Sequence, residues 1–142
     1  GRLSITADDL VQAARQCLGT PFRHQGRIAG VGLDCAGVAI HVARQCGLGV
    51  IDVDGYSRTP SGGQLEAALD AQPGLQRVAV LADRQPGDLL LMRFDSDPQH
   101  LAIDAGATII HAYEHVGQCC EHRLSSLWAA RIVRVYRFRG VE

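Results

Sequence analysis

The stretch GLDCAG at residues 32–37 places a cysteine at the start of a segment that has the pattern of a buried helix. Asp34 belongs to the residue types that cap helix N-termini, and the residues after Cys35 are apolar on nearly every side. Backbone N–H groups in a first helical turn have no partner within the helix and carry partial positive charge. We therefore expect Cys35 to be a nucleophile whose thiolate is favoured by the helix start.

The predicted helix continues through an apolar run to Cys46 and ends at Gly47. Apolar residues cover most sides of this helix, which is typical of a central helix packed against a sheet. Gly37 lowers the helix propensity of the first turn, so we expect it to permit a close backbone approach beside the thiol.

Composition bounds the class of protein. The chain has 142 residues, of which 46% are hydrophobic and 20% charged, which is typical of a single globular domain over residues 1–142. A formal net charge of −1 gives no electrostatic reason to expect nucleic acid or an anionic membrane as a partner. No signal peptide, membrane-spanning run or lipidation motif is recognised, so the sequence leaves the compartment unknown.

The cysteines do not form a recognisable framework. Their number is odd and no C-x-x-C spacing occurs, which argues against a full disulfide set and against a zinc ribbon. Cys119 and Cys120 would point to opposite sides of a strand, so they are poorly placed to chelate one ion together. Apart from Cys35, we interpret the cysteines as small apolar filler: Cys17, Cys46, Cys119 and Cys120.

Helical patterns come first and strand patterns second. A capped helix is predicted after Thr6, through Leu18, followed by a glycine-rich loop over residues 22–33. After Gly49, a polar connection that contains Tyr56 and Arg58 leads to a third helical pattern around Leu65, Ala68 and Leu69. Strands are predicted at 88–94, 100–104, 108–112, 117–123 and 132–138. This order favours an α+β domain, with N-terminal helices packed on an antiparallel sheet of about five strands.

Two histidines are candidate partners of Cys35. His100 opens one predicted strand and His111 closes the next, across a short turn at residues 105–107. In a hairpin these two ends lie side by side. We expect His100 to act as the base toward Cys35, while His111 holds the far ring nitrogen of His100 in the required tautomer.

Other interpretations of these residues stay open. His100 and His111 could be ordinary polar residues at strand ends. Alternatively Cys35, His100 and His111 could ligate zinc, although no fourth ligand lies nearby and no H-E-x-x-H or P-C-x-x-C motif occurs. The remaining histidines are interpreted as structural or exposed: His41, His115 and His122. His24, in the glycine-rich loop, could also line the cleft.

Five motifs follow one another along most of the chain: LGTPFR at 18–23, GLDCAG at 32–37, QPGDLL at 85–90, HLAI at 100–103 and IIHA at 109–112. Together they resemble the NlpC family of papain-like cysteine peptidases, which cut bacterial cell-wall peptides. The run at 23–26 and the closing pattern from 121–124 to 136–138 are most similar to the branch encoded in phage tail gene clusters and prophage-like elements.

The resemblance implies a papain-like fold and a triad of Cys35, His100 and His111. The implied reaction is hydrolysis of an amide bond in peptidoglycan stem peptides, often between D-glutamate and a diamino acid, through a thioacyl intermediate and without a cofactor. Because no signal peptide is recognised, we expect the protein to be cytoplasmic until it is assembled into a phage-like particle and acts on the cell wall. Phage tail proteins are then further candidate partners.

Departures from the family pattern concern the substrate. The family commonly has tyrosine where Phe22 stands, and many members have serine where Ala36 stands. We name Asp34, Phe22 and His24 as candidate substrate-binding residues. Asp34 could bind a substrate amine or serve only as the helix cap.

Two further functions compete with the peptidase. A structural tail-assembly module would keep the fold and a vestigial cleft but contribute little hydrolysis. An acyltransferase would keep the thiol chemistry but pass the acyl group to another amine or to a lipid, although the polar loop at 22–33 offers no obvious lipid groove.

Overall fold

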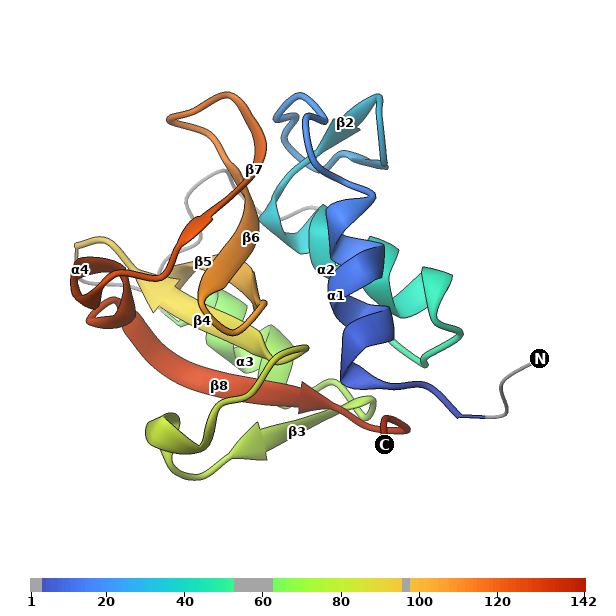
Figure 1. Cartoon of the computed structure of the whole chain (residues 1–142), viewed down its shortest axis with the longest axis vertical. Helices are drawn as coiled ribbons and strands as arrows, with labels where there is room; N and C mark the ends of the chain where they lie inside the picture. Colours follow the sequence, from blue (N-terminus) through green and yellow to red (C-terminus); the bar gives the residue numbers. More distant parts are fainter. Residues whose placement is uncertain (1–3, 53–62, 96–97) are drawn as a thin grey trace.

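The computed structural model describes residues 4–52, 63–95 and 98–142 of the chain. It is an α+β structure in which two N-terminal helices lie beside an antiparallel sheet (Figure 1). The predicted fold class is thereby confirmed. Most of the predicted polar connection, including Tyr56 and Arg58, lies outside the described residues.

The helices begin where the sequence predicts. Helix α1 (Ala7–Arg15) starts at a capping box, in which the Thr6 hydroxyl accepts the Asp9 N–H and the Asp9 carboxylate accepts the Thr6 N–H. Helix α2 (Cys35–Gln45) starts after Asp34, and Gly47 follows its end at a φ of 70°. Helix α3 (Gln64–Asp70) is the third predicted helix.

The main sheet has six strands in the order β3-β8-β4-β5-β6-β7, and every neighbouring pair is antiparallel. Five correspond to predicted strands: β4 (Leu89–Arg93), β5 (Pro98–Asp104), β6 (Thr108–Tyr113), β7 (Gln118–Arg123) and β8 (Ile132–Phe138). The additional edge strand is β3 (Leu75–Val78).

Smaller elements were not predicted from the sequence. Strands β1 (Arg27–Ile28) and β2 (Gly32–Leu33) form a short antiparallel ribbon inside the loop before Cys35. A 3₁₀ turn, η1 (Leu81–Asp83), follows β3, and a single helical turn, α4 (Ser126–Ala129), precedes β8.

The core lies on both faces of the sheet. In β4, Leu89 and Leu91 belong to the cluster shared with α1 and α2, whereas Leu90 and Met92 belong to a smaller cluster on the opposite face, beside Trp128. Alternation along a strand explains this division. Helix α2 packs against β5 and β6, the strands that carry the two candidate histidines (Figure 1).

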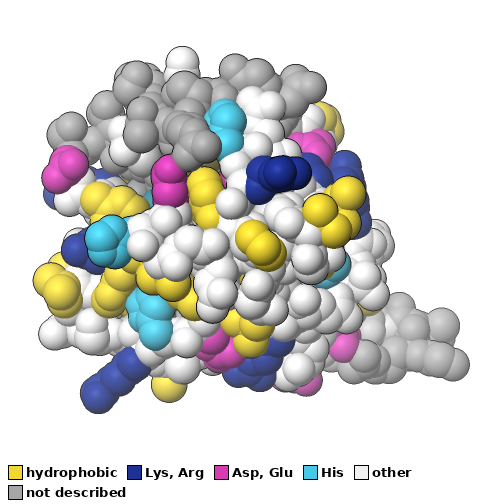
Figure 2. Space-filling model, turned by 90° about the horizontal axis from the view of Figure 1, so that it is seen from above, with side chains coloured by type: hydrophobic (Ala, Val, Ile, Leu, Met, Phe, Trp, Pro, Cys, Tyr) yellow, Lys and Arg dark blue, Asp and Glu magenta, His cyan; other side chains and the backbone are white. Residues whose placement is uncertain are grey.

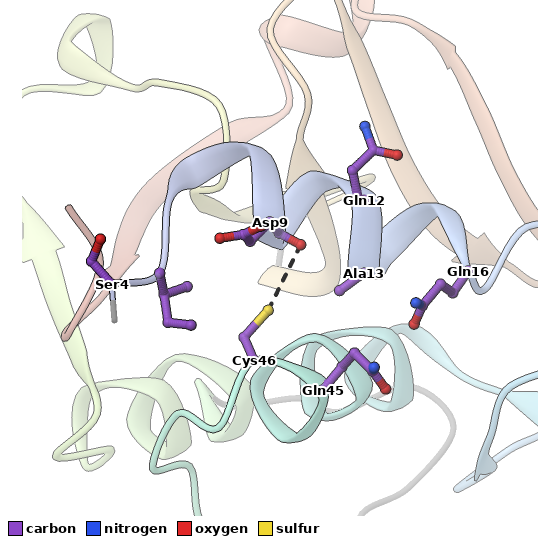
Figure 3. Close-up of a pocket in the computed structure, with 8 residues that line it drawn as sticks. Ser4, Asp9, Gln12, Ala13, Gln16, Gln45 and Cys46 are labelled. Carbon is purple, nitrogen blue, oxygen red and sulfur yellow. Dashed lines mark hydrogen bonds between the residues drawn. The ribbon is translucent and has the colours of Figure 1, made fainter. Parts of the chain in front are cut away.

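A hollow lies between α1 and the C-terminal end of α2, lined in part by Gln12, Gln16, Gln45 and Cys46 (Figure 3). The Cys46 thiol donates to the Asp9 carbonyl over 3.7 Å, so this sulfur takes part in helix–helix packing. Cys46 is eleven residues from Cys35, which corresponds to about 16 Å along a helix. The hollow is therefore separate from the candidate nucleophile. In the described part of the chain, no helix combines the length and apolarity needed to cross a bilayer.

Candidate active site

Asp34 fixes the start of the helix that presents Cys35. Its buried carboxylate accepts the Gly37 N–H over 2.8 Å and the Gln25 N–H over 2.8 Å, and it pairs with Arg27 Nη1 at 2.9 Å. The cap predicted from the sequence is therefore confirmed. Because both carboxylate oxygens are engaged within the protein, Asp34 acts here through its cap and its charge; direct contact with a substrate amine stays a prediction.

Gly37 permits the close backbone approach that the sequence indicates. A Cβ atom at this position would lie 2.2 Å from the carbonyl oxygen of Gly26, far inside any real contact. The loop before β1 thereby lies directly against the first turn of α2. Its residue His24 is partly exposed, next to Gln25, whose N–H is bound by Asp34. Phe22 is half-buried and pairs with Leu33 in an isolated bridge.

The electrostatics of Cys35 correct one prediction. The backbone amides of Leu101 and Ala36 lower the pKa of the thiol, as expected for N–H groups near sulfur. Burial and the neighbouring Asp34 charge act in the opposite sense and prevail, so the pKa of Cys35 rises to about 12. The expectation that the helix start favours the thiolate is therefore wrong for this state: the sulfur is a neutral thiol at pH 7.

The amide of Leu101 is available to sulfur because of the strand pairing. Asp104 exchanges backbone hydrogen bonds with Asp88 and Gly87 on the β4 side. Since bonding direction alternates along a strand, Leu101 faces β6 instead. Within the described strands, the β5–β6 ladder includes only Ile103 with Ile110 and Asp104 with Ile109. The Leu101 N–H is thus free of that ladder, and Cys35 lies beside the residue that follows His100.

His100 and His111 come together as the hairpin predicts. Nε2 of His100 lies 2.5 Å from Nδ1 of His111, and both side chains are buried, at 6% and 0% exposure. Burial is the main cause that lowers both pKa values, followed by neighbouring positive groups; the pKa of His111 falls to about 3 and that of His100 falls well below its usual range. Both rings are therefore neutral at pH 7.

A third histidine determines the direction of these hydrogen bonds. Nε2 of His111 lies 2.8 Å from Nε2 of His122, and Nδ1 of His122 lies 3.0 Å from the carbonyl oxygen of Arg123. A carbonyl only accepts, so Nδ1 of His122 carries a proton, and in the neutral ring its Nε2 then accepts from His111. Nδ1 of neutral His111 then accepts from Nε2 of His100.

This order leaves Nδ1 of His100 unprotonated. Among the described residues it has no hydrogen-bond partner, whereas every fully buried side-chain nitrogen or oxygen there has one. Nδ1 of His100 is therefore an open acceptor at the surface of the site, on the residue next to Leu101. A ring nitrogen in this state can take a proton from a thiol.

The sequence interpretation of His122 as structural or exposed did not assign it this role. Pairing of β6 with β7 sets His111 opposite Cys120 and Ile109 opposite His122, so the side chains of His111, Cys120 and His122 share one face. The signal was present in the sequence as histidines on both sides of the turn at Gly117, but it depends on the register of the hairpin.

Aromatic rings enclose the histidines. The ring of Trp128 lies 5.2 Å from that of His111 and 4.8 Å from that of His122, and Phe94 lies 5.3 Å from His100. The Arg131 guanidinium is 4.4 Å from the Trp128 ring. Figure 2, seen from above, shows some histidine side chains at the surface beside hydrophobic ones; His100 and His111 themselves are buried.

Comparison with solved structures shows the same fold. An NlpC/P60 family protein from Bacillus cereus superimposes with a TM-score of 0.69 at 21% identity, over 98% of this chain and 41% of that one. The NlpC/p60 domain of the peptidoglycan hydrolase SagA gives 0.65 at 22% identity, over 92% and 97%. The peptidoglycan hydrolase RipB from Mycobacterium tuberculosis gives 0.65 at 17% identity, over 96% and 65%.

The chain therefore spans less than half of the Bacillus protein but nearly all of the SagA domain. No curated protein matches the sequence. The sequence model of the NlpC/P60 family matches residues 19–137, which include Cys35 and all three linked histidines. Since this match covers most of the chain, the protein belongs to the NlpC/P60 family.

Proposed function

We propose that this protein is a cysteine endopeptidase that hydrolyses an amide bond in peptidoglycan stem peptides, with Cys35, His100 and His111 as its catalytic group. The observation that carries the proposal is the directed histidine chain, which leaves Nδ1 of His100 as an unprotonated acceptor on the residue next to Leu101, whose backbone N–H reaches the Cys35 thiol. Family membership and the likeness to two named peptidoglycan hydrolases support the cell wall as the substrate.

The reaction starts from a neutral pair. Nδ1 of His100 takes the Cys35 proton as the sulfur bonds to the scissile carbonyl carbon, which gives a tetrahedral oxyanion. The backbone N–H of Cys35, at the open start of α2, is a candidate donor to that oxyanion. His100 then returns the proton to the leaving amine, and the thioester that remains is hydrolysed by water with His100 as the base.

His111 and His122 support this cycle by position. During proton transfer His100 becomes positively charged, and its Nε2–H continues to donate to His111. Because His122 accepts from His111 in turn, His111 keeps a lone pair directed at His100. We assign His111 as the orienting member of the triad and His122 as a positioning residue behind it.

Substrate selection is proposed to involve Asp34, Phe22 and His24. All three belong to the segment around the first turn of α2, and Asp34 supplies a negative charge next to Cys35. Such a charge would favour a substrate amine nearby. The phage-tail association is also a proposal; it rests on the sequence patterns at 23–26 and from 121–124 to 136–138. Residues 1–142 are proposed to act as one peptidase domain.

The direct test is to incubate the protein with purified peptidoglycan fragments and to identify the products by mass spectrometry. Cys35→Ala and His100→Ala are compared with Cys46→Ala, which removes a thiol at the C-terminal end of α2, away from Cys35. New amine termini are expected from the unaltered protein and from Cys46→Ala. Equal product from Cys35→Ala would refute the mechanism, and no product from any variant would favour a structural tail module.

A further inference from the structure

One face of the β6–β7 hairpin gathers three side chains that can ligate a metal. His111 is opposite Cys120 in the strand register, and His122 follows Cys120 by two residues on the same face. The ligand atoms of these three residues all lie within 4.8 Å of one another. Cys120 has no part in the proposed peptidase reaction, and His122 has only a positioning part.

We propose that His111, Cys120 and His122 bind a zinc-like divalent cation, and that an ion held there reverses the tautomer of His100 and so removes the base of Cys35. The second half of this proposal rests on the proposed function. One thiolate and two imidazoles are ligands for zinc or cobalt rather than for magnesium or calcium. The fourth position would be filled by water, because Cys120 and His122 are partly exposed.

The surroundings already suit a metal ligand. A histidine that binds a metal through one nitrogen usually donates from the other nitrogen to a carboxylate or carbonyl. His122 does so here, since its Nδ1–H donates to the Arg123 carbonyl and leaves Nε2 free to ligate. The two Nε2 atoms of His111 and His122 are 2.8 Å apart, and two nitrogens on tetrahedral zinc are separated by about 3.3 Å. A small separation of the rings is sufficient.

Binding changes where each proton resides. In the free protein the protons are on Nε2 of His100, Nε2 of His111 and Nδ1 of His122. An ion on Nε2 of His111 requires the His111 proton to be on Nδ1. Nε2 of His100 must then accept, and its own proton is on Nδ1. Each imidazole keeps one proton, and the Cys120 thiol releases one to solvent as its sulfur bonds to the ion.

The contact between His100 and His111 permits either direction. At 2.5 Å it is a hydrogen bond whichever ring donates, so reversal needs no movement of the backbone. After reversal, Nδ1 of His100 carries a proton and cannot accept another. The neutral Cys35 thiol then has no base to accept its proton, so the thiolate does not form.

Cobalt tests the site without any hydrolysis. The Cys35→Ala protein, which has no nucleophile, is titrated with Co²⁺, and the thiolate-to-cobalt charge-transfer band is recorded. The band is expected to appear and to saturate at one equivalent. It should be lost in Cys35→Ala/Cys120→Ser and kept in Cys35→Ala/Cys46→Ser, which removes a different partly exposed thiol. No band, or a band that survives Cys120→Ser, would overturn the site.

Zinc tests the switch in the same Cys35→Ala protein. Long-range ¹H–¹⁵N spectra of the histidine rings distinguish Nε2–H from Nδ1–H directly. His100 is expected to change from Nε2–H to Nδ1–H when one equivalent of Zn²⁺ is added, and not to change in Cys35→Ala/Cys120→Ser. If the His100 tautomer does not change when zinc is added, the proposed switch is overturned. Both readouts are independent of peptidase activity, so failure of the proposed function would leave their outcome intact.

Discussion

Asp34 acts on the neighbouring Cys35 in two opposed ways. Its carboxylate caps the helix that presents the thiol, and its negative charge raises the pKa of that thiol. The cap favours a defined position for sulfur, whereas the charge keeps the sulfur protonated. The resting site therefore combines a neutral thiol with neutral imidazoles, and the nucleophile forms only when His100 accepts the proton.

This relationship predicts the effect of Asp34→Asn. Asparagine also caps helices, so α2 should keep its start, but the loss of the negative charge lowers the pKa of Cys35. Alkylation of Cys35 by iodoacetamide at pH 8, followed by peptide mass spectrometry, should become at least about twofold faster. Asp52→Asn serves as the control, because it removes another carboxylate that pairs with Arg27. Equal rates in the two variants would contradict the account.

His122 should matter through its acceptor. Glutamine at this position can still accept from Nε2 of His111, whereas leucine cannot. His122→Leu is therefore expected to lower kcat on stem peptides by about tenfold with little change in KM, and His122→Gln to retain most of kcat. Steady-state measurement of kcat and KM for the two variants and the unaltered protein tests this role. The positioning role would be refuted if leucine left kcat unchanged or if glutamine were as damaging as leucine.

Stability should fall in mild acid because His111 is buried in its neutral form. Its pKa in the folded protein is about 3, below the value near 6.5 of an unfolded chain. Between these two pH values the unfolded chain binds a proton that the folded protein does not bind. His111 therefore makes its full contribution to the free energy of unfolding above pH 6.5, and this contribution is lost as the pH decreases. From pH 7.5 to 5.5 the free energy of unfolding should fall by about 1.4 kcal/mol for this residue alone.

Urea unfolding at the two pH values measures this loss, and His111→Asn supplies the comparison. The variant lacks the titrating ring, so its own decrease between pH 7.5 and 5.5 should be smaller by about the same amount. An identical decrease in both proteins would show that His111 is not held neutral by the fold.

Asp88 should be a stabilising residue outside the active site. Its carboxylate is 1% exposed and binds the Arg137 guanidinium through two contacts of 2.8 and 2.9 Å. Asp88→Asn leaves the guanidinium without its anion and is expected to cost about 2–3 kcal/mol in urea unfolding. Glu121→Gln at the more exposed pair with Arg15 should cost clearly less than Asp88→Asn. The reverse order would contradict this ranking.

Local signals made part of the site predictable. Asp34 and Cys35 form a helix start within one turn of chain, and the hairpin between His100 and His111 needs only a short connection. Both are decided by neighbours in the sequence, and the structure has both. The short strand β3 was missed because only its first residue, Leu75, is fully buried, which leaves too little periodicity to recognise.

Features that depend on tertiary packing were not predictable. The pKa of Cys35 is set mainly by burial, and burial follows from how α2 packs on β5, not from the cap. The role of His122 depends on the β6–β7 register, since a shift of one residue would place this side chain on the other face of the sheet.

The thioester at Cys35 can be intercepted. When stem peptides are digested in the presence of hydroxylamine, an acyl group on sulfur partitions between water and the added nucleophile, and mass spectrometry separates the carboxylate from the hydroxamate. We predict both products from the unaltered protein and neither from Cys35→Ala. Carboxylate alone, formed at the same rate by Cys35→Ala, would contradict the claim that this sulfur carries the reaction.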